Sequence, residues 1–340
     1  MKKNEKLLFI TQKIHENDDD LAFVPQWIDQ FIKCGFEVQV ICLEKRDFDD
    51  RFKVFSLGKE NGNNKFKRII LFLKYVFQIK YDAVFVHMNP EYITLAGWFW
   101  RLKNKPVYLW YTHYTMHIHM RMAGLICTRM FAATPQSMPQ FNRSPKKTIL
   151  GHGLDIDFWI SDYSDNESGK DEYEIISVHR ICKSKRLELA ILSLLELPDK
   201  YTLSVYGRDV DMKYAQKMKN LVVEKKLSSR VTFHGPVPMW QLKNIYPKRR
   251  LMINFAPETI DKTMIECMLF GIFPVTTKGN AEAIGLTLSP EAETPKSIAN
   301  FILEGKWKKY STEELQNIIK EKHGLKSLVK KMSNFILIGK

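Results

Sequence analysis

The 340-residue sequence has little cysteine and no long apolar run. Its five cysteines are scattered, without a Cys-x-x-Cys pair or a Cys/His spacing that suits a metal. We therefore expect neither a disulfide framework nor structural zinc, and free thiols fit a reducing compartment. No stretch reaches the roughly 18 apolar residues of a membrane span. Only four apolar residues follow the basic N-terminus, too few for a signal peptide. The sequence thus predicts a cytoplasmic protein.

The glycine-rich signatures of the common nucleotide-dependent enzymes are also missing. The sequence contains no Gly-x-Gly-x-x-Gly and no Gly-Lys-Ser/Thr phosphate-binding loop, and it has no Gly-x-Ser-x-Gly turn. These absences exclude the usual dehydrogenase, NTPase and α/β-hydrolase interpretations.

Acidic residues are scarce in one band of the chain. Residues 61–150, the basic band, carry thirteen Lys or Arg but only Asp82 and Glu91, a net charge of +11 within a total of +14. Such a surplus indicates an anionic partner (membrane headgroups, a lipid-linked phosphate or a nucleic acid) unless it only keeps the surface soluble. Basic and aromatic residues occur together here, which suits a membrane interface. They are Lys65, Lys67, Arg68, Arg101, Lys103 and Lys105, with Trp98, Phe99 and Trp100 beside the last three.

Strand-like and helix-like segments alternate along the chain, as in parallel, doubly wound α/β sheets. In the first half we expect strands over residues 6–11, 37–43, 53–57, 82–87, 107–112, 130–133 and 148–150, and helices over 21–35, 65–80, 90–102 and 116–129. In the second half we expect strands over 173–178, 201–206, 231–234, 251–255 and from 273, and helices over 187–195, 212–226, 239–246, 295–304, 312–323 and 325–337. Residues 12–20 are expected to form a polar loop.

The pattern predicts two Rossmann-like domains with a cleft between them. Residues 161–172 are polar and read as the linker. The expected domains are therefore 1–160 and 173–324, with a C-terminal helix over 325–340 that could pack back on the first domain.

Two glutamates follow the strand predicted over 251–255. Glu258 and Glu266 stand eight positions apart, one before a helix and one inside it, and the helix should stop at Gly271. Carboxyl ends of parallel strands are where open α/β sheets bind ligands. A solvated helix face is the alternative, but apolar neighbours surround Glu266. A buried carboxylate needs a hydrogen-bonding partner, which a ligand's hydroxyl groups could supply.

A basic cluster follows the strand predicted over 173–178. Arg180, Lys183, Lys185 and Arg186 precede a helix, whose N-terminus favours anions. Arg grips a phosphate bidentately and Lys adds a point charge, so a pyrophosphate fits, with a solvated turn as the alternative. Gly207 and Gly235 end the next two strands, where they could let the backbone approach a nucleotide base.

Three histidines stand at predicted strand ends, His87, His113 and His152. His113 should face the cleft, because its helix begins only near Met116. His117 and His119 are two positions apart and would face opposite sides of a helix, so we predict no metal site.

With these clusters in place, the chain resembles the family-4 (group 1) retaining glycosyltransferases of the GT-B fold. The resemblance is strong over residues 173–285 and diffuse over 1–160. It rests on two glutamates separated by seven residues and followed by Gly and Pro-Val, and on an Arg followed five positions later by a Lys. The matching residues are Glu258, Glu266, Gly271, Pro274 and Val275, Arg180 and Lys185, with Tyr206-Gly207, Gly151–Asp155 and Gly279–Glu282 as further matches.

The resemblance implies a role for each of these residues. Arg180 and Lys185 would hold the diphosphate of a nucleotide-sugar donor, and Glu266 would accept hydrogen bonds from ribose. The donor sugar would be contacted by Glu258 and His113, and the phosphates by backbone amides around Asp261, Lys262 and Thr263. Members retain the anomeric configuration and need neither a metal nor another cofactor.

Two positions depart from the common pattern. Many members carry Gly-Phe-Gly after the first glutamate, whereas this chain has Thr259-Ile260-Asp261. The position after Lys185, often Gly, is Arg186. Asp261 could read a sugar hydroxyl, so we expect donor choice to depend on it.

The resemblance implies a hexosyltransferase-like enzyme acting on a glycan or lipid-linked acceptor in polysaccharide or glycolipid synthesis. With the basic band, it suggests a peripheral position at the inner face of the cell membrane. The alternatives are a nucleotide-sugar epimerase of the same fold and a basic nucleic-acid-binding protein. No nucleic-acid motif is present, so we expect no nucleic acid as partner.

Overall fold

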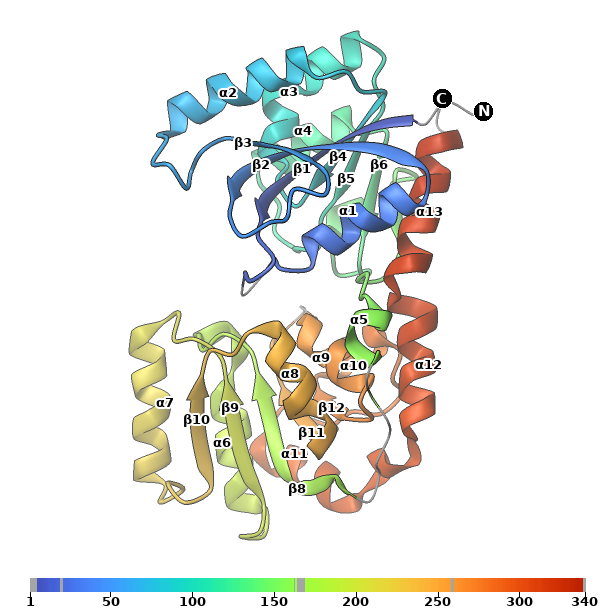
Figure 1. Ribbon diagram of the computed structural model, residues 1–340. Helices are drawn as coiled ribbons and strands as arrows, with labels where there is room; N and C mark the ends of the chain where they lie inside the picture. Colours follow the sequence, from blue (N-terminus) through green and yellow to red (C-terminus); the bar gives the residue numbers. More distant parts are fainter. Residues whose placement is uncertain (1–4, 19–20, 162, 164–168, 258–259, 339–340) are drawn as a thin grey trace. The chain divides into compact units, whose positions relative to one another are not determined.

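The computed structural model describes residues 5–18, 21–161, 163, 169–257 and 260–338, which form two compact units. Unit 1 comprises Met1–Asp155 and Gly324–Lys340, and unit 2 comprises Ile156–His323. Within the described residues, each unit holds one parallel sheet with helices on both faces (Figure 1). The predicted α/β class with two doubly wound sheets is confirmed.

The sheet of unit 1 has seven strands in the order β3-β2-β1-β4-β5-β6-β7. Strand β1 lies inside the sheet and pairs in parallel with both β2 and β4, and its residues Leu8, Phe9 and Ile10 are fully buried because helices cover both faces. The strands are β1 (Glu5–Ile14), β2 (Phe36–Lys45), β3 (Lys53–Ser56), β4 (Ala83–His87), β5 (Val107–Trp110), β6 (Arg129–Ala132) and β7 (Lys147–Ile149).

Helices from both ends of the chain cover one face of this sheet. Trp27 and Phe31 of α1 (Val24–Lys33) share a core with Leu328 and Met332 of α13 (Leu325–Ile338), and Figure 1 shows the two helices side by side. The C-terminal helix therefore belongs to unit 1. The opposite face is covered by α2 (Lys65–Gln78), α3 (Glu91–Leu102) and α4 (Ile118–Ile126).

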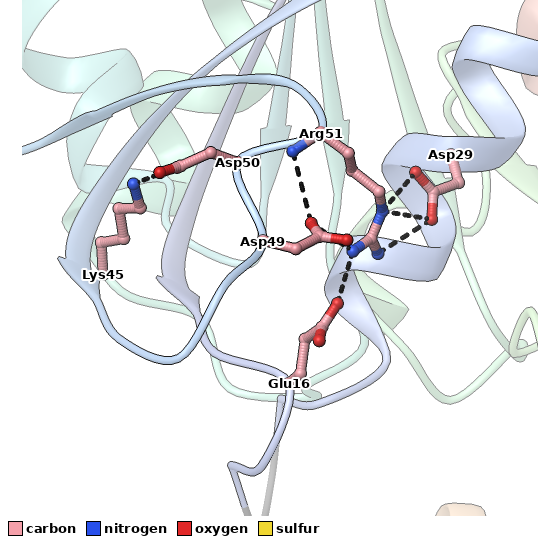
Figure 2. A network of polar contacts seen from close by, with 6 residues as sticks. All are labelled: Glu16, Asp29, Lys45, Asp49, Asp50 and Arg51. Atoms are coloured by element: carbon pink, nitrogen blue, oxygen red, sulfur yellow. Dashed lines mark hydrogen bonds and ion pairs between the residues drawn. The ribbon is translucent and has the colours of Figure 1, made fainter.

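The charged loop between β2 and β3 carries Arg51, whose guanidinium group pairs with three carboxylates of unit 1. Arg51 donates hydrogen bonds to both carboxylate oxygens of Asp29 on α1, at 3.1 Å to Oδ1 and 3.0 Å to Oδ2, and also pairs with Glu16 and Asp49 (Figure 2). These contacts fix the expected excursion between the second and third strands to the first helix, because an Arg fork can bind several carboxylates at once.

The sheet of unit 2 has five strands in the order β10-β9-β8-β11-β12. Its strands are β8 (Asp171–Val178), β9 (Thr202–Tyr206), β10 (Val231–Gly235), β11 (Arg249–Asn254) and β12 (Phe273–Thr276). The strand order reverses at β8, which lies between β9 and β11. Such a reversal is where open α/β sheets bind ligands.

Helices pack in two groups in unit 2: α6 contacts α7 and α11, and α12 contacts α9 and α10. The helices are α5 (Ile156–Ile160), α6 (Leu187–Ser193), α7 (Met212–Glu224), α8 (Met239–Ile245), α9 (Lys262–Met268), α10 (Lys278–Ile284), α11 (Pro295–Glu304) and α12 (Thr312–His323). As expected from the sequence, α9 ends before Gly271, whose φ is +74°.

Several boundaries differ from those expected. The units divide at Asp155–Ile156 rather than after residue 160, because Trp159 of the unpredicted helix α5 packs on Tyr246 and Phe270. At the other end of the linker, β8 already begins at Asp171. Residues 162 and 164–168 of that expected linker lie outside the described part of the chain.

Two further differences have local causes. Strand β1 runs on into the expected polar loop, because Lys13 and Ile14 stay in register with β2 and Ile14 is buried. Helix α4 ends at Ile126, well before residue 129, because Arg129 already pairs with β5 in strand β6.

Candidate functional site

The candidate site lies at the strand-order reversal of unit 2. The Arg180–Lys185 segment follows β8, and the Asp261–Glu266 segment follows the neighbouring strand β11. Parallel neighbours end at the same edge of a sheet. The structure therefore brings together the basic and the acidic segments that the sequence singled out.

One ion pair joins the two segments. Lys185 Nζ lies 2.5 Å from Asp261 Oδ1, and the other carboxylate oxygen accepts a hydrogen bond of 2.8 Å from Asn254 Nδ2. Lys185 is buried and Asp261 half-buried. Burial alone would raise the pKa of Asp261, but attraction by Lys185 and the hydrogen bonds from Lys185 and Asn254 outweigh it. The pKa therefore lies below its usual range.

Glu266 carries its carboxylate in a nearly closed environment. Its side chain is 5 % exposed, and within the described residues no hydrogen bond reaches the carboxylate. Burial raises its pKa to about 7, with the Lys262 charge opposing and the Asp261 charge adding to the shift. Burial also lowers the pKa of Lys262, one helical turn away. A hydrogen bond donated by a ligand would stabilise the ionised form of Glu266.

A hydrogen bond from Thr263 joins the start of α9 to β8, whereas the residue at the N-cap position does not cap the helix. Thr263 Oγ1 donates a 2.7 Å hydrogen bond to the Val178 carbonyl oxygen. Asp261 occupies the N-cap position, yet its side chain accepts no hydrogen bond from the first turn. The carboxylate is instead directed to Lys185 and Asn254.

Gly207 and Gly235 meet through their backbones. Gly207 N donates a 2.8 Å hydrogen bond to the Gly235 carbonyl oxygen. Beside them, the rings of Tyr206 and His234 stack with centroids 4.4 Å apart. The predicted contact of either glycine with a base stays a prediction. In the structure, the two glycines join the ends of β9 and β10 through a backbone hydrogen bond.

The two arginines of the basic cluster have different environments. Arg180 is exposed, and no ion pair that the structure describes includes it. Arg186 pairs with Glu293 and has a φ of +52°. That left-handed conformation costs a side-chain-bearing residue energy, which explains why a glycine suits this position.

Two predicted site residues cannot be placed beside this cluster. Glu258 lies, with Thr259, outside the described residues. His113 is in unit 1, exposed after β5, with its ring centroid 5.5 Å from that of Tyr111. Their contacts with a donor sugar therefore remain predictions.

The other histidines of unit 1 have structural partners. His87 Nδ1 shares a 3.2 Å hydrogen bond with Thr11 Oγ1, and His152 is buried. His117 Nε2 bonds the Tyr111 hydroxyl, and His119 Nδ1 bonds Thr94 Oγ1. In the described part of the chain, no three His, Cys, Asp or Glu side chains are placed to hold a metal ion together.

Sequence reasoning missed two buried polar residues of the site. Asn254, at the end of β11, accepts a 3.0 Å hydrogen bond from Ala256 N and donates to Asp261. His179 precedes Arg180 and is buried, which lowers its pKa and keeps it neutral near physiological pH. A polar residue at a strand's carboxyl end was the only available signal for either.

Comparison with known proteins supports the resemblance. The model of the family described as "Glycosyl transferases group 1" matches residues 162–285. No curated protein matches the chain by sequence. No helix within the described ranges is both long enough and apolar enough to cross a membrane.

Solved structures match over nearly the whole chain at low sequence identity. Anabaena Alr3699/HepE in complex with UDP-glucose has a TM-score of 0.74 at 16% identity, covering 98% of this chain and 99% of its own. A glycosyltransferase from Rickettsia africae ESF-5 has a TM-score of 0.77 at 13% identity, covering 99% and 100%. The lipopolysaccharide outer core galactosyltransferase WaaB has a TM-score of 0.71 at 15% identity, covering 98% and 100%.

These likenesses extend beyond the region that the family model matches and are likenesses of fold. Together with the match over residues 162–285, they support the GT-B fold and the group 1 part of the resemblance. The chain has the GT-B fold, and its second unit carries the match to group 1 glycosyltransferases.

Proposed function

We propose that this protein is a retaining glycosyltransferase that moves a sugar from a nucleotide diphosphate donor. The observation that carries the proposal is the convergence of Lys185 and the Asp261–Glu266 segment at the strand-order reversal of unit 2. The family match over residues 162–285 supports the same activity. Retention of configuration is taken from the resemblance.

In this proposal the side chains of unit 2 act on the donor's leaving group. Transfer breaks the bond between the anomeric carbon and a phosphate oxygen, and negative charge develops on the departing diphosphate. Arg180 and Lys185 would stabilise that charge. Glu266 would accept hydrogen bonds from the ribose hydroxyls, and this would satisfy its buried carboxylate. Charge stabilisation by these cations means that the proposed reaction needs no metal, which activity in the presence of EDTA would test.

A UDP-sugar is the first donor to test. The Anabaena protein, similar in fold, was crystallised with UDP-glucose. A ligand that binds only the folded state raises the melting temperature. Screening UDP-, GDP- and ADP-sugars by thermal shift should therefore identify one base that stabilises the protein. If none of the three stabilises it, the proposed function is wrong.

We further propose that the enzyme works at the inner face of the cell membrane on a glycan or lipid-linked acceptor, in cell-surface polysaccharide or glycolipid synthesis. The support comes from helices α2 and α3 of unit 1, which each present a second apolar stripe on the side away from the core. The stripes consist of Phe66, Ile70 and Phe77 on α2 and of Leu95, Trp98 and Leu102 on α3.

We call these two stripes, together with the exposed cations near them, the α2–α3 face. Phe77 of α2 contacts Phe99 of α3, with ring centroids 4.6 Å apart, and Figure 1 shows the helices next to each other. Lys65, Lys67, Arg101 and Lys103 are exposed on the same helices or directly after them. Exposed aromatic and aliphatic side chains bordered by cations suit anionic headgroups above an apolar layer. Trp100, which the sequence placed in this interface, is instead buried and donates to the Tyr81 hydroxyl.

A further inference from the structure

Lys185, the cation proposed to hold the donor diphosphate, already has an anion from its own chain. Its ammonium lies 2.5 Å from Asp261 Oδ1, across 76 positions of sequence. Lys185 is only 7 % exposed, so few other groups can reach its ammonium. Any phosphate that binds Lys185 must therefore approach close to the Asp261 carboxylate.

A hydrogen bond from Asn254 holds the Asp261 carboxylate in this position. Its second oxygen accepts a hydrogen bond from Asn254, whose own carbonyl oxygen is occupied by the Ala256 amide. Asn254 is 1 % exposed, and its amide group is therefore fixed in orientation. The carboxylate also makes no capping bond within α9, so no helix contact competes for it. The fold thus directs Asp261 to Lys185.

We propose that Asp261 is a built-in competitor for the anion-binding position of Lys185, and that it weakens the hold on the nucleoside diphosphate product. The inference rests on the proposed function. A diphosphate at Lys185 either displaces the carboxylate from the ammonium or sits beside it as a like charge, and both outcomes oppose binding. The nucleoside part of the ligand does not meet this carboxylate. Asp261 would accordingly favour release of the charged product after transfer.

The test compares binding of UDP and of uridine to the full-length protein by isothermal titration calorimetry. Asp261→Asn keeps the shape and the hydrogen bond from Asn254 but removes the charge, and Asp261→Gly removes the side chain. We expect both variants to bind UDP at least about tenfold more tightly than wild type, with the Kd for uridine unchanged. Asp261→Glu, which keeps the charge, should stay close to wild type. Unchanged or weaker UDP binding by folded Asp261→Asn would overturn the proposal.

A double-mutant cycle with Lys185→Met shows whether the effect passes through Lys185. In the Lys185→Met background, Asp261→Asn should tighten UDP binding by less than it does in wild type, because only the like-charge repulsion is left to remove; an equal or larger gain there would contradict the competition for Lys185. A melting curve for each variant establishes that it is folded. If Asp261→Asn does not fold, Asp261→Gly takes its place in the comparison. If wild type and variants all fail to bind UDP, GDP and ADP, the proposed function fails and this inference with it. If wild type binds but the charge-free variants gain nothing, this inference alone fails.

Discussion

The backbone of Gly207 lies directly against the carbonyl oxygen of His179. A Cβ on residue 207 would stand 1.9 Å from that oxygen, and the φ of Gly207 is +146°. His179 N in turn donates a 3.0 Å hydrogen bond to the Tyr206 carbonyl oxygen. The end of β9 therefore sets the position of the segment that carries Arg180, and it does so through an approach that only glycine allows.

Replacing Gly207 with Ala should consequently disturb both stability and donor binding. We expect the free energy of unfolding to fall by about 2–4 kcal/mol, since backbone has to move to remove the clash. Urea denaturation measures this change. Gly279→Ala is the matched control: nothing lies within 4 Å of its Cβ position, and it is in helix α10. The free energy of unfolding of Gly279→Ala should rise by up to about 1 kcal/mol. A Gly207→Ala protein as stable as wild type would refute the steric argument.

The raised pKa of Glu266 predicts that the stability of the folded protein depends on pH. The folded-state pKa of about 7 exceeds the ordinary value of 4.5, so the unfolded chain loses this proton first as the pH rises. Stability should therefore fall between about pH 4.5 and 7 through this group, and Glu266→Gln should remove the loss. From pH 4 to pH 7.5, the free energy of unfolding of the variant should rise relative to that of wild type by on the order of 1–3 kcal/mol. Urea unfolding of both proteins at the two pH values gives the comparison; a difference that does not change with pH would disprove it.

Lys226 offers a separate test of backbone strain. It follows α7 with a φ of +57°, whereas Lys225 before it has a φ of −86°, and both side chains are exposed. Lys226→Gly should stabilise the protein by about 1 kcal/mol, because glycine adopts the left-handed conformation without strain. Lys225→Gly should not stabilise it. Equal effects of the two substitutions on the urea midpoint would show that φ is not the cause.

The α2–α3 face predicts binding to anionic vesicles. Phe66 and Leu102 are 73 % and 83 % exposed, so Phe66→Ser with Leu102→Ser should leave the fold intact and reduce co-sedimentation with phosphatidylglycerol vesicles. Trp98→Ala should act in the same direction. Trp240→Ala on unit 2 is its control, since both tryptophans are 54 % exposed. High salt should weaken binding through the cations. Failure of wild type to sediment with these vesicles at low salt would rule out the membrane proposal.

Much of the fold could be predicted because strand-length apolar runs and helix periods are local properties. The helical period also separates the residues of α3, although the sequence interpretation treated them together. Ile93, Ala96 and Trp100 share the buried face, and Leu95, Trp98 and Leu102 share the exposed one. Applied to the aromatic cluster, this period would have placed Trp100 in the core.

The site could be predicted only in part. Arg180, Lys185 and Glu266 stood out because charged residues at strand ends and in apolar helices are unusual. The ion pair between Lys185 and Asp261 could not be predicted, because it depends on β8 and β11 being neighbours. Asn254 has no spacing signature, and the packing of α5 on Tyr246 and Phe270 is a long-range contact.

The most direct test of the proposed donor site is titration of UDP-glucose, or of the donor that the thermal-shift screen selects, into wild type and two variants. Arg180→Ala removes an exposed guanidinium beside the site, and Lys217→Ala removes an exposed cation on α7 as the control. We predict saturable binding to wild type and Lys217→Ala, and a Kd at least about tenfold higher for Arg180→Ala, as loss of a charge-assisted hydrogen bond implies. Equal affinity of Arg180→Ala and wild type would contradict the proposed donor site.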